Sequence, residues 1–155
     1  MTTTAKTHRF PVAVHWQGGR VTRACAFDRP DLRVATPPQF RGGVPGVWSP
    51  EELLVAAAAS CFALTLAGVA ERLEVPVLGL DVTGSGEVGG RDDGRFGFVS
   101  LELVVRVETT QDALERAAEA VKAAEERCIV GVALDMPIRV AVDVAAAPVL
   151  IERNA

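Results

Sequence analysis

The sequence predicts a single α+β domain over residues 1–155, with the element order βββ-α-ββ-α-β. Three observations lead to this prediction. Apolar and polar residues alternate near both ends of the chain, as they do in half-buried strands. A long apolar stretch follows a helix-capping motif in the middle of the chain, and a later stretch repeats apolar residues at helical spacing. No internal repeat indicates a second domain.

Composition fits a globular protein that folds without metal or disulfide bonds. The chain has 155 residues, of which 49% are hydrophobic and 23% charged, and a domain of this length can bury a sizeable core. The net charge of −4 argues against nucleic acid as a partner, because phosphate binding needs a concentrated basic face. The first residues lack the apolar segment of an export signal, so we expect a cytoplasmic protein.

The first third of the chain predicts a hairpin, a short strand and a loop. Apolar residues alternate over residues 12–16 and again over 21–27, and the turn residues 17–20 separate the two runs. A third strand is expected at residues 32–34. The Pro- and Gly-rich residues 36–46 form a loop that is long for a compact domain, which favours a functional or partner-binding role.

A strong helix start follows this loop. Ser49 can cap, Pro50 suits the first helical position, and Glu52 completes a capping box. Residues 53–70 are then almost entirely apolar, which is just long enough for a membrane span. Interfacial aromatic and basic anchors are missing. We therefore expect the buried central helix of a soluble fold, with no membrane partner.

The second half predicts a hairpin, a helix and a last strand. Strands are expected at residues 78–83 and 99–108, joined by the turn-rich residues 89–94, because their apolar residues alternate. Residues 112–127 show helical periodicity with one apolar face, and residues 138–144 alternate again.

Two of the three cysteines lie on predicted apolar helix faces. Cys61 lies within the apolar helix, and Cys128 follows Val121 by one heptad, so packing of the two helices would bring the sulfurs together. Cys25 lies in an edge-like strand and is interpreted as structural. The chain has two histidines and no CxxC motif, so we expect no metal site and no cofactor, and a disulfide oxidoreductase is disfavoured.

The segment Gly84–Gly89 matches the dinucleotide-binding pattern GxGxxG, but a turn and a strand follow it instead of a helix. Nucleotide binding is therefore disfavoured. We expect these glycines to permit a bulge or a close backbone approach in a strand.

The sequence resembles the OsmC/Ohr family of hydroperoxide-reducing proteins. The resemblance rests on Ser49-Pro50-Glu51-Glu52-Leu53-Leu54 followed by Ala58-Ala59-Ser60-Cys61-Phe62, and on Gly18-Gly19-Arg20 with the loop at residues 36–43. It implies antiparallel sheets that wrap two central helices in an intertwined homodimer. It does not decide between the OsmC and Ohr subfamilies.

This resemblance also implies a role for four residues. Cys61 would be the peroxidatic thiolate and Cys128 the resolving thiol, while Arg20 and Glu51 would position the peroxide. Arg23 competes with Arg20 for the arginine role. The family usually has proline directly after the resolving cysteine and serine two residues beyond it, whereas this chain has Cys128-Ile129-Val130-Gly131.

The implied activity is reduction of organic hydroperoxides through a Cys61 sulfenic acid and a Cys61–Cys128 disulfide. An external dithiol, for which the family suggests a lipoylated protein, would complete turnover. The alternative is a redox-inactive dimeric binding or scaffold protein that keeps both cysteines as core residues.

The spacing of Glu51 and Cys61 predicts a break in the first helix. Ten residues in one straight helix give about 15 Å of rise and a rotation of roughly 280°, so the two residues would not share a site. We expect a break or tight bend near residues 56–59. Otherwise Glu51 would have to reach the site from a mobile first turn or from the partner chain.

Overall fold

The computed structural model describes residues 6–147 and divides the chain into two compact units, Met1–Leu53 and Leu54–Ala155. The predicted α+β class and element order are confirmed. A short 3-10 helix and one short helix are added, so that the elements follow each other as β1, β2, β3, α1, β4, β5, the 3-10 helix, α2, α3 and β6.

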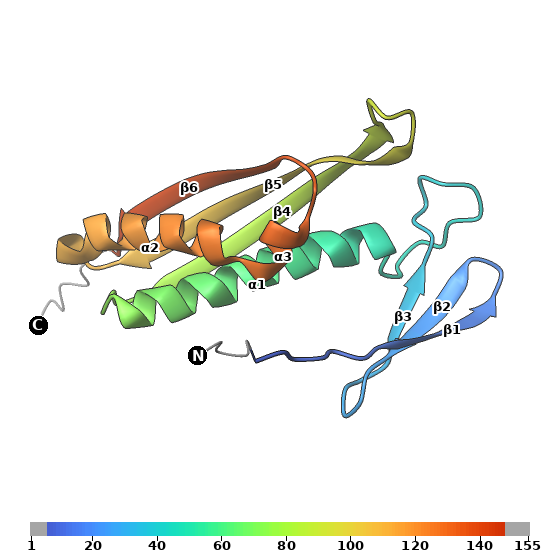
Figure 1. Cartoon of the computed structure of the whole chain (residues 1–155), viewed down its shortest axis with the longest axis horizontal. Coiled ribbons are helices and arrows are strands. Elements are labelled where there is room, and N and C mark those ends of the chain that lie inside the picture. Colours follow the sequence, from blue (N-terminus) through green and yellow to red (C-terminus); the bar gives the residue numbers. More distant parts are fainter. Residues whose placement is uncertain (1–5, 148–155) are drawn as a thin grey trace, which may run out of the picture. The chain divides into compact units, whose positions relative to one another are not determined.

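The N-terminal unit contains a three-stranded antiparallel sheet (Figure 1). Its strands are β1 (Ala13–Gly18), β2 (Val21–Cys25) and β3 (Leu32–Ala35). The predicted hairpin turn places Gly18 at φ +102° and Gly19 at φ +52°, a region that glycine enters at little steric cost. Because β3 pairs with the free side of β2, the expectation that Cys25 lies in an edge strand is wrong: β2 is central.

Helix α1 (Pro50–Arg72) begins at the predicted capping box. The N–H of Ser49 donates to the Glu52 carboxylate at 2.8 Å, and the N–H of Glu52 donates to the Ser49 hydroxyl at 3.1 Å. The predicted break near residues 56–59 is wrong, because α1 runs without interruption. Residues 56–59 are all alanine, the residue type with the highest helix propensity. No proline or π-bulge lies among them to bend the helix.

The C-terminal unit is built on the sheet β4–β5–β6. Strands β4 (Gly79–Gly90) and β5 (Phe96–Thr109) pair antiparallel, as expected. Strand β6 (Ile138–Ala146) differs from the expected antiparallel arrangement, because it runs parallel to β5. Parallel neighbours need a long crossover connection, which here contains the 3-10 helix Gln111–Ala113, α2 (Leu114–Arg127) and α3 (Ile129–Ala133).

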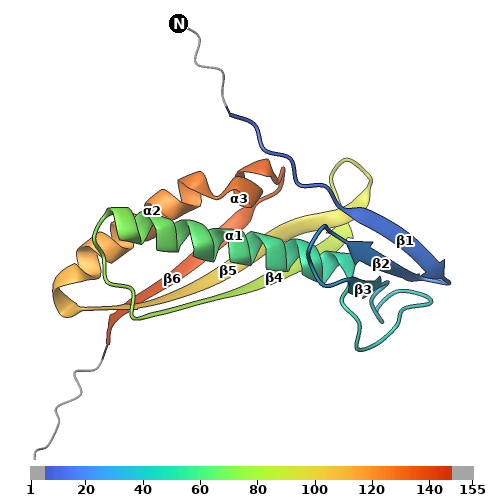
Figure 2. The same ribbon diagram turned by 90° about the horizontal axis from the view of Figure 1, so that it is seen from below.

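The residues of α1 within this unit lie with α2 on one face of the sheet β4–β5–β6 (Figures 1 and 2). The core between them consists of small and medium apolar side chains, which include Ala58, Phe62, Leu66, Leu101, Leu103, Val105, Ala117 and Val121. Cys128 is part of this core, and Cys61 packs against it.

The glycines of β4 allow α1 to approach the sheet closely. A Cβ atom added at Gly84 would lie 2.7 Å from Val55 Cγ1, and one added at Gly86 would lie 3.0 Å from Val55 Cγ2. These glycines belong to the GxGxxG pattern, which lies inside a strand. The expected close approach is confirmed.

Helix α1 has the length and apolar composition that a membrane crossing requires, and it is the one such helix within residues 6–147. A core helix of a soluble protein meets the same criteria. Five of its 23 residues are buried within the chain: Ala58, Phe62, Leu66, Val69 and Ala70.

Candidate active site

The C-terminal unit brings Cys61 and Cys128 together. Cys61 lies in the middle of α1, and Cys128 lies where α2 ends and α3 begins. The N–H of Val130, two residues after Cys128, donates to Cys61 Sγ at 3.5 Å, and both thiols are free. Cys128 belongs to the core against which Cys61 packs, so the fold brings the two cysteines to the same part of the C-terminal unit.

Cys128 occupies a turn and not the body of a helix. Its φ of −65° and ψ of 106° are extended, so α2 ends at Arg127 and the chain changes direction before α3. The Sγ atom of Cys128 accepts a hydrogen bond from the N–H of Gly131 at 3.4 Å. The sequence periodicity predicts the burial of Cys128, which is 3% exposed, but not this change of direction.

The surroundings shift the pKa values of the two thiols in opposite directions. Burial raises the pKa of Cys61, but hydrogen bonds outweigh it and hold the pKa below its ordinary value. Their donors are the Val130 N–H, Cys128, the Thr65 hydroxyl and the Ile129 N–H. Burial raises the pKa of the Cys128 thiol, and the neighbouring Cys61 raises it further. The arrangement therefore favours the thiolate form of Cys61 and the neutral thiol form of Cys128.

A pocket of about 220 Å³ opens beside Cys128 within the same unit. Its walls are mainly apolar and include Phe62, Leu103, Val132, Met136 and Ile138, while Glu125 supplies a carboxylate. The pocket thus places an apolar space next to one of the two sulfurs, and such spaces accommodate alkyl or aryl groups.

Glu51 lies in the first turn of the uninterrupted helix α1. Ten residues of helix separate it from Cys61, which is about 15 Å of rise, so the structure does not bring these two residues of one chain together. One carboxylate oxygen of Glu51 is buried and has no hydrogen-bond partner among the described residues. A buried carboxylate oxygen without a donor is costly.

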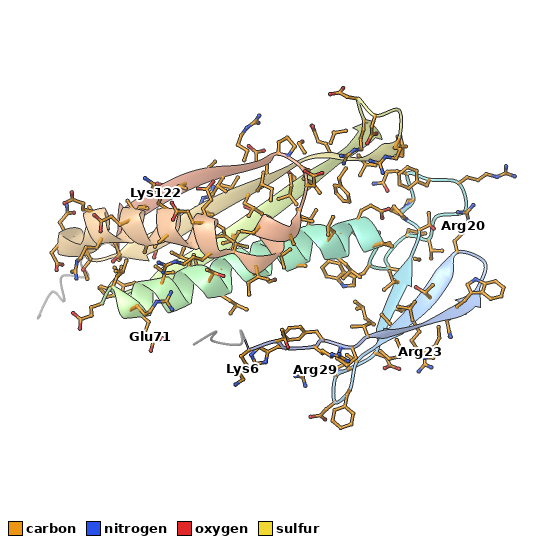
Figure 3. All side chains as sticks on the ribbon, in the orientation of Figure 1. Lys6, Arg20, Arg23, Arg29, Glu71 and Lys122 are labelled. Atoms are coloured by element: carbon orange, nitrogen blue, oxygen red, sulfur yellow. The ribbon has the colours of Figure 1, made fainter. Side chains whose placement is uncertain are left out.

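The two arginine candidates lie in the N-terminal unit (Figure 3). Arg23 on β2 forms a 2.6 Å ion pair with Asp31, and this engages its guanidinium. Arg20 follows the hairpin turn, and its side chain lies against Gly42 of the following loop, where an added Cβ atom would be 3.2 Å from Arg20 Cγ. No ion pair among residues 6–147 includes Arg20.

Cys25 belongs to the N-terminal unit. A hydrogen bond with Asp31 and partial burial raise the pKa of its thiol, so Cys25 is less ready to ionise than an ordinary cysteine. Within the described part of the chain, no three His, Cys, Asp or Glu side chains are grouped so that they could hold a metal ion.

Sequence reasoning missed three groups that lower the pKa of Cys61: the Thr65 hydroxyl and the N–H groups of Ile129 and Val130. A signal for Thr65 was present, because residues four apart on a helix share a face. No signal for the two N–H groups was present, because every residue except proline carries one.

The OsmC-like protein family matches residues 43–143 of the chain. No curated protein matches the sequence significantly. An OsmC-like protein of unknown function from Vibrio cholerae is similar in structure, with a TM-score of 0.81 and 17% identity, over 88% of this chain and 100% of that chain. An organic hydroperoxide resistance protein from Elizabethkingia anophelis has a TM-score of 0.71 and 21% identity, over 93% and 100%.

The organic hydroperoxide resistance protein OhrB of Bacillus subtilis is also similar, with a TM-score of 0.64 and 24% identity, over 88% of this chain and 98% of that chain. The match at residues 43–143 covers α1, which carries Cys61, and the turn that carries Cys128. By this match and by its fold, the chain is a member of the OsmC-like protein family.

Proposed function

We propose that the protein is a cysteine-based peroxidase that reduces organic hydroperoxides to alcohols. The observation that carries this proposal is the hydrogen bond from the Val130 N–H to Cys61 Sγ, which holds the turn that carries Cys128 against Cys61. The pKa of Cys61 is lowered there and that of Cys128 is raised. A peroxidatic thiol must ionise to attack the peroxide, whereas a resolving thiol reacts only after the sulfenic acid has formed and can be protonated until then. Cys61 suits the first role and Cys128 the second.

The proposed reaction has three steps. The Cys61 thiolate attacks one peroxide oxygen, the O–O bond breaks, and the alkoxide leaves as an alcohol after it takes up a proton. Cys61 becomes a sulfenic acid, which condenses with the Cys128 thiol to give a disulfide and water. An external dithiol then reduces the disulfide and is itself oxidised, and a lipoylated protein is the proposed reductant.

The apolar pocket beside Cys128 supports an organic substrate over hydrogen peroxide. Its volume of about 220 Å³ offers burial to an alkyl or aryl group, which hydrogen peroxide lacks. Arg20 and Glu51 are proposed to position the peroxide. The buried, unpartnered oxygen of Glu51 supports this role for Glu51, because it requires a donor that the described residues of its own chain do not supply.

We further propose a cytoplasmic homodimer. Helix α1 carries apolar residues on all sides, and Leu64 on it is 75% exposed. On β1, Val14 and Trp16 are 61% and 73% exposed, and they point to the same face of the strand. Because about 15 Å of helix rise separates Glu51 from Cys61 in one chain, we propose that Glu51 of the partner subunit serves the site. The cytoplasm would keep Cys128 reduced between turnovers.

Consumption of cumene hydroperoxide with dihydrolipoamide as the reductant tests the proposal. We expect multiple turnovers with cumene hydroperoxide and slower turnover with hydrogen peroxide at equal concentration. Light scattering on the same sample should give the mass of a dimer. A protein that consumes neither peroxide would instead be a redox-inactive scaffold or binding protein.

A further inference from the structure

The pocket beside Cys128 has a buried apolar inner wall and a charged residue at its mouth. Among the residues that line it, Phe62 is 1% exposed, Leu103 2% and Cys128 3%, so they form the inner wall. Val132 is 72% exposed and Glu125 is also exposed, so these two lie at the mouth. All five residues belong to the C-terminal unit. A group that enters toward Cys128 therefore passes close to the Glu125 carboxylate.

Helix α2 places Glu125 at the edge of its apolar face. Glu125 lies four residues after the core residue Val121, so the two side chains share a helix face. Lys122 is three residues before Glu125 on the same helix (Figure 3), but no ion pair among residues 6–147 includes Glu125. An exposed carboxylate is ionised at neutral pH. The mouth of the pocket therefore carries a negative charge that no ion pair offsets.

The volume of the pocket sets the size of the group that it can hold. An apolar cavity of about 150 Å³ is large enough for benzene, and this pocket has about 220 Å³. It can therefore take a substituted phenyl ring or a branched alkyl group of similar size. Glu125 is the one charged residue among the described residues that line it, so a carboxylate on the entering group would meet a like charge and no cation.

We propose that Glu125 is a specificity-determining residue, through which the pocket selects hydroperoxides with an uncharged alkyl or aryl group over those that carry a carboxylate on that group. The inference rests on the proposed peroxidase function for the identity of the ligand, and it adds the charge of the substrate. A carboxylate that entered would lose hydration and be repelled by Glu125. An uncharged group of the same size gains burial without either cost.

Protection of Cys128 from alkylation reports occupancy of this pocket without any peroxide, because Cys128 lines it. The probes are para-isopropylbenzamide, which is neutral, and para-isopropylbenzoate, which is anionic and nearly equal in shape. Iodoacetamide modifies the reduced full-length protein at several probe concentrations, and mass spectrometry of the Cys128 peptide gives the initial rate. We expect the amide to protect Cys128 at a lower concentration than the benzoate, and added salt to reduce the difference, because salt screens exposed charges.

Glu125→Gln removes the charge with almost no change in shape. It should lower the half-protecting concentration of the benzoate about two- to fivefold and leave that of the amide unchanged. Glu126→Gln is the matched control, because Glu126 is an exposed neighbour that is not among the pocket's lining residues. Equal half-protecting concentrations of the two probes in the wild type, the same effect of both substitutions, or no protection by the amide would overturn the proposal.

Steady-state kinetics separate this inference from the proposed function. The kcat/KM for cumene hydroperoxide should exceed that for its para-carboxylate analogue, and Glu125→Gln should raise the value for the analogue about two- to fivefold. A protein that reduces neither compound but shows the expected protection would contradict the proposed function and leave the role of Glu125 in place. A protein that reduces both equally well, with equal protection by the two probes, would contradict the role of Glu125 and leave the peroxidase proposal in place.

Discussion

The N–H of Val130 donates to the sulfur of Cys61 across 69 residues of sequence, at a distance of 3.5 Å. This contact joins the turn that carries Cys128 to the helix that carries Cys61. It holds the turn that carries Cys128 against α1, and it adds a donor that favours the Cys61 thiolate. The proposed peroxidase function depends on this contact between the two segments.

Oxidation should give one intramolecular disulfide between Cys61 and Cys128. The turn that carries Cys128 is already hydrogen-bonded to Cys61 Sγ through Val130, so the disulfide requires little movement of the backbone. The protein is treated with cumene hydroperoxide, its remaining free thiols are then blocked, and peptide mapping after digestion identifies the linked peptides. Cys25 should be recovered as a blocked free thiol. A crosslink that contains Cys25 in place of this pair would show that the resolving residue is wrongly assigned.

Substitution of each cysteine should have a different effect. Cys61→Ser should abolish peroxide consumption, because serine lacks a thiolate, and should leave folding nearly unchanged, because little volume is lost. Cys128→Ser should still reduce about one equivalent of peroxide per chain and then stop with a sulfenic acid on Cys61, which dimedone traps. Unimpaired turnover in Cys61→Ser would remove the basis for the proposed enzyme.

The reaction of Cys61 with peroxide should begin at a lower pH than that of an ordinary thiol. Because the pKa of Cys61 is lowered, its thiolate fraction rises with pH and reaches half below the ordinary value of about 8.5. The pKa of Cys25 is raised, so Cys25 provides an internal comparison. Alkylation rates of both residues in one sample, from about pH 5 to about pH 9, measure the difference. Parallel profiles for the two residues would contradict the assigned environments.

Valine at position 84 should destabilise the protein. An added Cβ atom would lie 2.7 Å from Val55 Cγ1 and 3.3 Å from Leu103 Cδ2, so α1 and β4 would have to separate or repack. We expect a loss of about 1–3 kcal/mol in the free energy of unfolding, as for other overpacked cores. Gly90→Val is the matched control, because nothing lies within 4 Å of its added Cβ. Urea unfolding of both variants should show a loss for Gly84→Val alone.

The sequence predicts those parts of the fold that depend on local chemistry. The spacing of Ser49 and Glu52 predicts the start of α1, and the hydrogen bonds of the capping box confirm it. The glycines of β4 signal a close approach because only glycine leaves room for Val55. The element order follows from hydrophobic periodicity, which depends on side chains alone.

The details of the site depend on tertiary geometry that no pattern encodes. The predicted break in α1 assumes that Glu51 and Cys61 of one chain share a site. The alanine-rich sequence instead favours the continuous helix that is observed. The turn at Cys128 and the donor from Val130 arise from main-chain groups, which are the same for most residue types. Only their position in space makes them part of the site.

A thiol count after addition of one equivalent of cumene hydroperoxide tests the central claim most directly. The reduced protein has three cysteines, and Ellman's reagent under denaturing conditions should report all of them. The account predicts a fall to about one thiol per chain, with Cys61 and Cys128 consumed together through sulfenic acid and disulfide, and full recovery after addition of dihydrolipoamide. A count that stays at three while the peroxide remains in solution would contradict the account.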